Sequence, residues 1–474
     1  MGCPHSGRQS ERGSEGVERR DFLHAAVAIG GTSALAACID REDGGPATGN
    51  QTTPEPGTDN ESTPDFDFED DENFAYIPPI YRNLDRVDAQ HAWNRYLETN
   101  EHDVPHPPRH HVLVLADYAG TGTPTDPERT TMEQALEQLE AAYEWSNDGL
   151  LFTVGYSPAY FDRFEADLPE EVDLPEPADI SRFDDPELEA YDVSIHLSSD
   201  HAQAVLAAEE ALFGNVEELN DGIAVEESLE GVLQKRDRRT GFIGAGLPAD
   251  HQDVDGLPDS EPVSEEAPLY MGFQTNQSSR EIHPYHGQTG ATFVHNQNSE
   301  YGVMIKDGRF RYGTTQHVSR LRLELEDWYG EHSLEQRVDK MFGGQFNVRS
   351  VGEVGEKARE ANIFSREQDL DTSGGLVGHA EKMALAREHG VPLILRRDFD
   401  TADNDQAGVH FVSLQEEISD FVQTRAVMDG VEFETDVEEI GARENNGILD
   451  FVHAESRANF LVPPRDLRSL PRPQ

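Results

Sequence analysis

The sequence has few cysteines, few lysines and no long run of basic residues. Its 474 residues include only Cys3 and Cys38, so a network of disulfides cannot hold the folded part together. The lack of a long basic run disfavours binding to nucleic acid, because too few cations stand together to displace the counterions of the phosphates. We therefore expect no nucleic-acid partner.

Charge of one sign dominates the chain. The sequence carries 38 Lys and Arg against 93 Asp and Glu, a formal net charge of −55, and only five of the basic residues are lysines. Such an acidic surface suits molar salt, where a Debye length of about 3 Å screens the repulsion between like charges. Apolar residues make up 36% of the chain and include 22 Phe, which is enough for the cores of two or three domains. The composition predicts a folded, halophilic protein.

The N-terminal segment, residues 1–37, has the order of features found in an export signal. Arg19-Arg20 precedes Phe22-Leu23, and an apolar run from Ala25 to Ala37 ends at Cys38. The run is too short for a membrane-spanning helix of about 20 residues. The arginine pair resembles a twin-arginine signal, and Leu35-Ala36-Ala37-Cys38 resembles a lipobox. This implies export, cleavage before Cys38 and a lipid on its thiol at the outer face of the cytoplasmic membrane. A chance arginine pair before a soluble helix is the alternative.

Residues 38–75 read as an acidic spacer. Residues 40–72 contain 12 acidic side chains and a single basic one, Arg41, together with several prolines. Such a segment buries too little apolar surface to offset its loss of conformational entropy, so we expect it to be disordered. The folded body begins after it.

Strand and helix patterns alternate in the first half of the body, residues 76–236. Strands are predicted at residues 111–115, 150–154, 193–197 and 222–233, and helices from Pro127 and at residues 202–213. The order β-α-β-β-α-β predicts a ferredoxin-like domain, which is an antiparallel sheet with two helices on one face.

The second half, residues 237–474, shows a longer version of the same pattern. Helices are predicted at residues 334–342, 376–389 and 418–428, and strands at residues 268–273, 293–305, 320–325, 391–395 and 409–414. We expect a second ferredoxin-like domain and an α+β fold for the whole body.

Several segments of the body resemble Dyp-type (dye-decolourising) haem peroxidases. Residues 394–399, 408–415 and 421–423 are similar to the C-terminal domain of that family. Residues 151–163 and 192–205 are similar to its N-terminal domain, and residues 459–464 to its closing strand. The resemblance covers residues 105 to 465 and implies two ferredoxin-like domains, with haem b held by the second.

The resemblance also implies two residues on the haem. His379, 17 positions before Arg396, matches the proximal histidine, and a neutral imidazole is a suitable iron ligand. Arg396 matches the distal arginine, a cation that stabilises charge as the peroxide O–O bond breaks. Asp450 is the candidate acceptor for the second N–H of His379, with a solvated aspartate as the alternative. Alternative ligands are His317, His389 and His410, and the alternative arginine is Arg397.

One motif departs from the family pattern. The family carries an acid–base aspartate in a Gly-x-x-Asp-Gly motif, but the matching residues 241–246 have Gly244 at that position. Glycine cannot transfer protons, which counts against rapid peroxide cleavage. Asp255 is the candidate replacement, and a polar acidic turn is the alternative interpretation of its segment.

Two other patterns have weaker functional interpretations. Asp398, Asp400, Asp403 and Asp405 offer oxygen ligands, but the glycine turn and closing glutamate of a calcium loop are missing, so we expect a solvated loop. Trp328-Tyr329 could pass electrons from a bulky donor, with core packing as the alternative.

These observations predict an exported, lipid-anchored haem peroxidase that oxidises an unknown reducing donor with hydrogen peroxide. The alternative, favoured by Gly244, is a haem-binding or haem-handling surface protein with little or no turnover. A third interpretation is an anchored structural protein of the cell surface, for which the acidic spacer is the argument.

Overall fold

The computed structural model describes residues 88–99, 105–214, 216–273, 300, 302–358, 374–388, 391–430 and 439–474. The predicted signal, Cys38, the spacer and His389 lie outside these residues. None of the helices in the described ranges is both long and apolar enough to cross a membrane.

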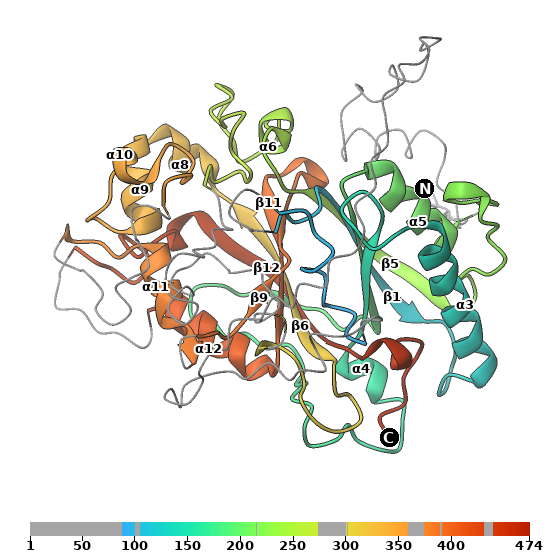
Figure 1. Ribbon diagram of the computed structural model, residues 1–474. Helices are drawn as coiled ribbons and strands as arrows, with labels where there is room; N and C mark the ends of the chain where they lie inside the picture. The colour runs from blue at the N-terminus through green and yellow to red at the C-terminus, as the bar shows by residue number, and fades with distance from the viewer. Residues whose placement is uncertain are drawn as a thin grey trace, which may run out of the picture.

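The N-terminal half is a ferredoxin-like unit. Its strands lie in the order β5-β1-β4-β2 and pair antiparallel, as a β-α-β-β-α-β chain predicts. Helices α3 and α5 cover the face of this sheet that points away from the other half (Figure 1). The elements are β1 (His110–Tyr118), α3 (Asp126–Ala142), β2 (Leu151–Tyr156), α4 (Pro158–Phe161), β3 (Glu187–Leu188), β4 (Val193–Ser199), α5 (Ala202–Phe213) and β5 (Leu233–Phe242).

Helix α3 shows how the local sequence sets an element. The Thr125 side chain accepts a hydrogen bond from the Glu128 N–H, and the Glu128 carboxylate accepts one from the Thr125 N–H at 2.7 Å. This capping box satisfies two N–H groups at the start of the helix. Met132, Leu136 and Leu139 then bury one stripe of the helix against the sheet, as their spacing predicts.

The C-terminal half repeats this topology with a longer connection. Its strands lie in the order β12-β6-β11-β9, and α12 packs against β6 and β11. Helices α8, α9, α10 and α11 lie with α12 on the side of the molecule opposite α3 and α5 (Figure 1). The elements are α6 (Leu247–Asp250), β6 (Thr314–Leu323), α8 (Leu325–Gly330), α9 (Leu334–Phe342), α10 (Val348–Val351), α11 (His379–Leu385), β7 (Arg387–Glu388), β8 (Val391–Pro392), β9 (Leu395–Arg396), β10 (Phe399–Thr401), β11 (Gly408–Gln415), α12 (Ile418–Met428) and β12 (Val452–Val462).

The two sheets join into one that closes on itself. Strand β2 pairs with β12 through Tyr156 and Leu461, and β10 pairs with both β11 and β5. The closed sheet encloses a small apolar core that includes Leu113, Phe399 and Phe460. The predicted α+β fold with two ferredoxin-like units is confirmed by this strand order.

The structure corrects several predicted boundaries. The fourth strand is Leu233–Phe242 and not residues 222–233, so the predicted domain boundary between residues 236 and 237 falls inside it. Residues 268–273 are turns, and Tyr270 is held there by hydrogen bonds instead of strand pairing. The long helix predicted at residues 376–389 is shortened to α11. The predicted strand at residues 391–395 divides into β8 and β9, since Leu393 and Ile394 turn into the core between them.

Candidate functional site

A large cavity separates the C-terminal sheet from helices α11 and α12. It encloses an empty volume of about 1370 Å³, part of it open to solvent. Strands β6, β11 and β12 supply one wall, and the helices and the β9–β10 segment supply the others. The lining is mostly apolar and includes Met271, Phe273, Leu321, Met341, Phe342, Met383, Ile394, Phe411, Phe421 and Met428.

Methionine is concentrated at this cavity. Met271, Met341, Met383 and Met428 line it, while the whole chain contains only seven methionines. Unbranched thioether side chains adapt to the shape of a bulky apolar ligand better than branched ones. The lining therefore favours a large apolar ligand over a small polar one.

His379 is the first residue of α11 and lines the cavity. Gly447 lies directly behind it with φ of +63°, and a Cβ there would be 3.2 Å from the His379 Cα atom. The close approach is held by a hydrogen bond of 2.7 Å from the Gly447 N–H to the Val377 carbonyl. Glycine at residue 447 thus lets one loop fix the backbone that carries the imidazole.

The surroundings of His379 keep its ring neutral. Burial, together with the nearby charges of Lys382 and Arg396, lowers the pKa of His379 to about 3. Lys382, one turn along α11, is itself buried and donates hydrogen bonds to the carbonyls of Met428 (2.7 Å) and Asn446 (3.0 Å). A neutral imidazole that faces an apolar cavity is a suitable metal ligand.

Arg396 and Asp398 line another part of the same cavity. The Arg396 Nη1 atom lies 3.7 Å from the Asp398 Oδ2 atom. Asp400 follows on β10 and is fully buried, with its carboxylate accepting a hydrogen bond from the Tyr270 N–H. Burial raises the pKa of Asp400 well above its usual range, and the neighbouring Asp398 raises it further. One cation and two carboxyl groups therefore meet at this wall.

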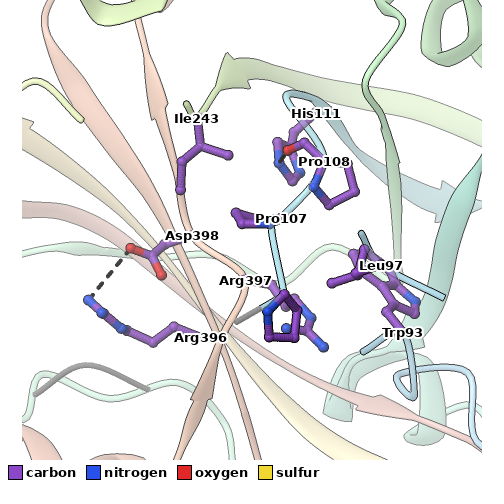
Figure 2. Close-up of a pocket in the computed structure, with 10 residues that line it drawn as sticks. Trp93, Leu97, Pro107, Pro108, His111, Ile243, Arg396, Arg397 and Asp398 are labelled. Atoms are coloured by element: carbon purple, nitrogen blue, oxygen red, sulfur yellow. Dashed lines mark hydrogen bonds and ion pairs between the residues drawn. The ribbon is translucent and has the colours of Figure 1, made fainter. Parts of the chain in front are cut away.

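Arg396 and Asp398 also border a second, smaller cavity of about 410 Å³. Figure 2 shows their ion pair on one side of it, with Trp93 and Leu97 on the other side and Pro107 between them. The remaining lining residues are Pro105, Pro108, His111, Ile243 and Arg397. The Arg396–Asp398 pair thus stands at the border of both cavities.

Arg397 is directed away from the large cavity. Its guanidinium donates hydrogen bonds to the Glu300 carboxylate (3.1 Å) and the Asn94 side chain (2.8 Å), and it lies over the ring of Trp93. Strand β9 ends at Arg396, and Arg396 but not Arg397 lines the large cavity. The structure assigns that position to Arg396.

Two predicted site residues are not brought to the cavity. Asp255 is exposed, and its backbone pairs with Gln406 in a surface turn. Asp450 is half-buried with its carboxylate 3.9 Å from the Arg443 guanidinium, and no hydrogen bond joins it to His379. The structure therefore does not place Asp255 as the replacement for the missing aspartate, and its polar segment lies at the surface. Asp450 is not the acceptor for the second N–H of His379, because it pairs with an arginine.

The alternative histidine ligands within the described residues are engaged elsewhere. The ring nitrogens of His317 lie 2.8 Å from the Asn459 Oδ1 atom and 2.7 Å from the Ser319 Oγ atom. The ring of His410 lies 3.1 Å from Asp403. Neither ring lines the large cavity, so among the histidines considered, His379 alone does so in the described part of the chain.

The acidic cluster after the arginine pair is not a solvated loop. Asp398 and Asp400 line the cavity, and Asp403 accepts hydrogen bonds from Thr240. Across the described ranges no group of three or more His, Cys, Asp or Glu side chains is placed to hold a metal ion.

Trp328 is buried in the core and donates a hydrogen bond to the Met271 carbonyl, a packing role.

Gly244 has a backbone reason to be glycine. Its φ is +127°, a conformation that side-chain-bearing residues rarely adopt, although a Cβ would meet only ordinary contacts with Arg109. Gly244 lines neither cavity.

A sequence model of DUF7405, a family of unknown function, matches residues 108–464. The chain belongs to the DUF7405 family. The match extends from before β1 to the end of β12, so the cavity and all its lining residues belong to the region that defines the family. A comparison with curated proteins found no match.

Solved structures of similar fold include three peroxidases. The dye-decolourising peroxidase of Bacteroides thetaiotaomicron has a TM-score of 0.48 and 15% identity, covering 79% of this chain and 98% of that one. The encapsulated DyP-type peroxidase of Mycobacterium smegmatis has a TM-score of 0.47 and 14% identity, with the same coverage. DyPB of Rhodococcus jostii has a TM-score of 0.47 and 13% identity, covering 77% of this chain and 96% of that one. These values give no residue role in this chain.

The sequence analysis did not identify two arginines that line the cavity. Arg425 on α12 and Arg457 on β12 both line it. Arg457 lies two residues after Glu455 on β12 and directly before the mostly apolar residues Ala458 to Val462, so the local charge pattern gave no clear signal that it lines a cavity.

Proposed function

We propose that this DUF7405 protein binds haem b in the large cavity and uses it to oxidise a donor with hydrogen peroxide. One observation carries the proposal: the neutral imidazole of His379 and the guanidinium of Arg396 line the same large apolar cavity. Haem is flat and apolar, needs an axial ligand and carries carboxylates, and the cavity offers a ligand, an apolar wall and cations.

The residues of the cavity have distinct roles in this proposal. His379 holds the iron, which supplies the redox chemistry when haem is bound. Arg396 stabilises the negative charge that develops on the departing oxygen of the peroxide. Asp398, 3.7 Å from Arg396, accepts a proton from one peroxide oxygen and returns it to the other. Asp398 takes over the role that Gly244 leaves vacant.

The first test is haem binding by the purified full-length protein in molar salt. Reconstitution with haem is expected to give a Soret band that is lost in His379→Ala and retained in His201→Ala. His201 is a suitable control because it is exposed and lies in the N-terminal half. No Soret band in the wild-type protein would refute the proposal.

The second test separates a peroxidase from a haem carrier. Oxidation of a dye or phenolic donor by hydrogen peroxide is expected to exceed the background of a non-specific haem protein by orders of magnitude, and to fall in Arg396→Leu. Haem bound without turnover above background would favour the alternative function, a haem-binding or haem-handling protein, which the glycine at residue 244 supports.

Export and anchoring belong to the same proposal and rest on residues 19–38 alone. Twin-arginine export carries folded proteins, which suits a protein with an inserted cofactor. Mass spectrometry of the mature protein is expected to find a lipid on Cys38 as the N-terminal residue. A Cys38→Ser variant is expected in the medium instead of the membrane fraction, and an unprocessed N-terminus would contradict this part.

A further inference from the structure

Arg457 is a buried cation on the wall of the large cavity. It lies on β12 opposite Ser319 of β6, and both residues face the cavity. Only 1% of its surface is exposed. An arginine so enclosed has lost nearly all of its hydration, so it requires compensating partners within the protein or in a ligand.

The protein supplies few such partners. Within the described ranges Arg457 makes one hydrogen bond, from its Nη1 atom to the Ala178 carbonyl at 3.4 Å, and its buried Nε atom has none. It forms no ion pair with any carboxylate of that part of the chain. Asp184, Asp179 and Asp429 act on the Arg457 charge without an ion pair to it, and Asp184 and Asp429 lie 3.0 Å and 2.9 Å from Arg425 instead.

Other buried arginines in the described ranges are treated differently. Arg239 pairs with Glu189, Arg397 with Glu300 and Arg468 with Glu133. Each of these cations has a carboxylate of the protein beside it. Arg457 therefore differs from these buried arginines, because it has no carboxylate partner among the described residues. It also lies at the wall of a cavity.

A second arginine, Arg425, adds to the unfavourable surroundings of the Arg457 charge. Arg425 also lines the cavity, and its positive charge is the main electrostatic influence that lowers the pKa of Arg457 after burial. Arg425 has its own carboxylate partners in Asp184 and Asp429, whereas Arg457 has none among the described residues. A negative ligand group beside Arg457 would supply the missing partner and offset the influence of Arg425.

We infer that Arg457 binds a carboxylate of the ligand that fills this cavity. The inference rests on the proposed function, in which that carboxylate is a haem propionate. The ligand class is then an apolar molecule with a carboxylate at its edge, and Arg457 is the residue that recognises the acidic edge. Charge-assisted hydrogen bonds to a carboxylate are the strongest that a guanidinium makes, so the contact contributes to both affinity and orientation.

The test compares haem with its dimethyl ester, which has the same ring and no carboxylate. Both are titrated into the full-length apoprotein in molar salt, and binding is followed by the Soret band. The wild-type protein is expected to bind free haem about tenfold or more tightly than the ester, since loss of one charge-assisted hydrogen bond has an effect of that order. In Arg457→Met this preference is expected to fall close to one.

Two further variants control for charge and fold. Arg457→Lys keeps the charge and is expected to retain part of the preference. Arg320→Met removes a neighbouring strand arginine that pairs with Glu455 at 3.1 Å outside the cavity, and it is expected to retain the full preference. Because methionine removes an uncompensated buried charge, the apoprotein of Arg457→Met is expected to melt at the same temperature as the wild type or higher.

The outcomes distinguish this inference from the proposed function. A wild-type protein that binds neither compound overturns the proposed function and the inference with it. A wild-type protein that binds haem and its ester equally well overturns the inference alone, and this measurement needs no variant to fold. An unchanged preference in Arg457→Met also overturns it.

Discussion

His379 and Arg396 line one cavity although they belong to different elements, the first turn of α11 and the end of β9. They are close enough for the charge of Arg396 to contribute to the lowered pKa of His379. A ligand in the cavity therefore meets a neutral nitrogen base and a permanent cation. This pairing is the basis of the haem hypothesis, and the predictions below test the residues around it.

Asp398→Asn is expected to slow the reaction with peroxide by about 100-fold or more, because the group that accepts the proton is lost. Haem binding should be unchanged, since Asp398 lies beside Arg396 and not beside His379. Stopped-flow measurements of the peroxide reaction and of cyanide binding, which also requires a proton acceptor, provide the readout. Asp405→Asn, an exposed residue of the same segment, is the control. Wild-type rates in Asp398→Asn would exclude it as the proton acceptor.

Gly244→Asp is expected to destabilise the protein instead of restoring the family motif. The backbone at residue 244 has φ of +127°, and forcing a side-chain-bearing residue into such a conformation costs about 1–3 kcal/mol. Chemical denaturation measures the change in the free energy of unfolding. Gly122→Asp is the control, because a Cβ at residue 122 meets no atom within 4 Å and the backbone has no positive φ. A stable and faster enzyme in Gly244→Asp would contradict this view of the site.

Glu300 is expected to make stability depend on pH. Burial raises the pKa of Glu300 to about 7, although Arg397 acts in the opposite direction. The folded protein therefore binds this proton more tightly than the unfolded chain, whose glutamate titrates near 4.5. The stabilisation of the folded state by this proton is therefore complete below pH 4.5 and is lost as the pH rises towards 7, by an amount on the order of 2–3 kcal/mol.

Glu300→Gln removes that titration. The free energy of unfolding of the variant, measured by denaturation from pH 5 to pH 8 in constant molar salt, is expected to vary less with pH than that of the wild type. Glu137→Gln, at an exposed position of α3, should follow the wild type. Parallel pH profiles for Glu300→Gln and the wild type would show that Glu300 does not titrate in this range.

Lys382→Met is expected to destabilise the protein by about 2–4 kcal/mol. The Lys382 ammonium donates hydrogen bonds to the Met428 carbonyl and to both the carbonyl and the side chain of Asn446, and its loss leaves these buried acceptors unsatisfied. The loop that contains Gly447 would also lose an anchor behind His379, so haem affinity should fall. Denaturation and haem titration measure both effects. Lys357→Met, at an exposed position, is the control, and equal behaviour of the two variants would refute the proposed anchoring role.

The sequence predicted elements best where local signals agreed. The apolar residues of α3 and α12 are spaced as in a helix, and α3 also begins with a capping box. The positions of both helices were predicted closely. Prediction failed at residues 222–242, where the apolar pattern was assigned to the wrong segment. Strand β5 contains several charged residues, and its arginines pair with acids such as Glu209. The strand therefore lacks the alternation of apolar and polar residues that marks a half-buried strand.

For the site, the sequence by itself determined the residues that a family pattern can mark, His379 and Arg396, and the absence of an aspartate at residue 244. Only the tertiary structure decided which other charges reach the cavity. In a chain with 93 acidic residues, nothing local separates the buried Asp400 from the exposed Asp255. That difference arises because β10 packs between β5 and β11, whereas residue 255 lies in a surface turn. Burial of a charge depends on contacts between distant segments, and these exist only once the sheet has closed.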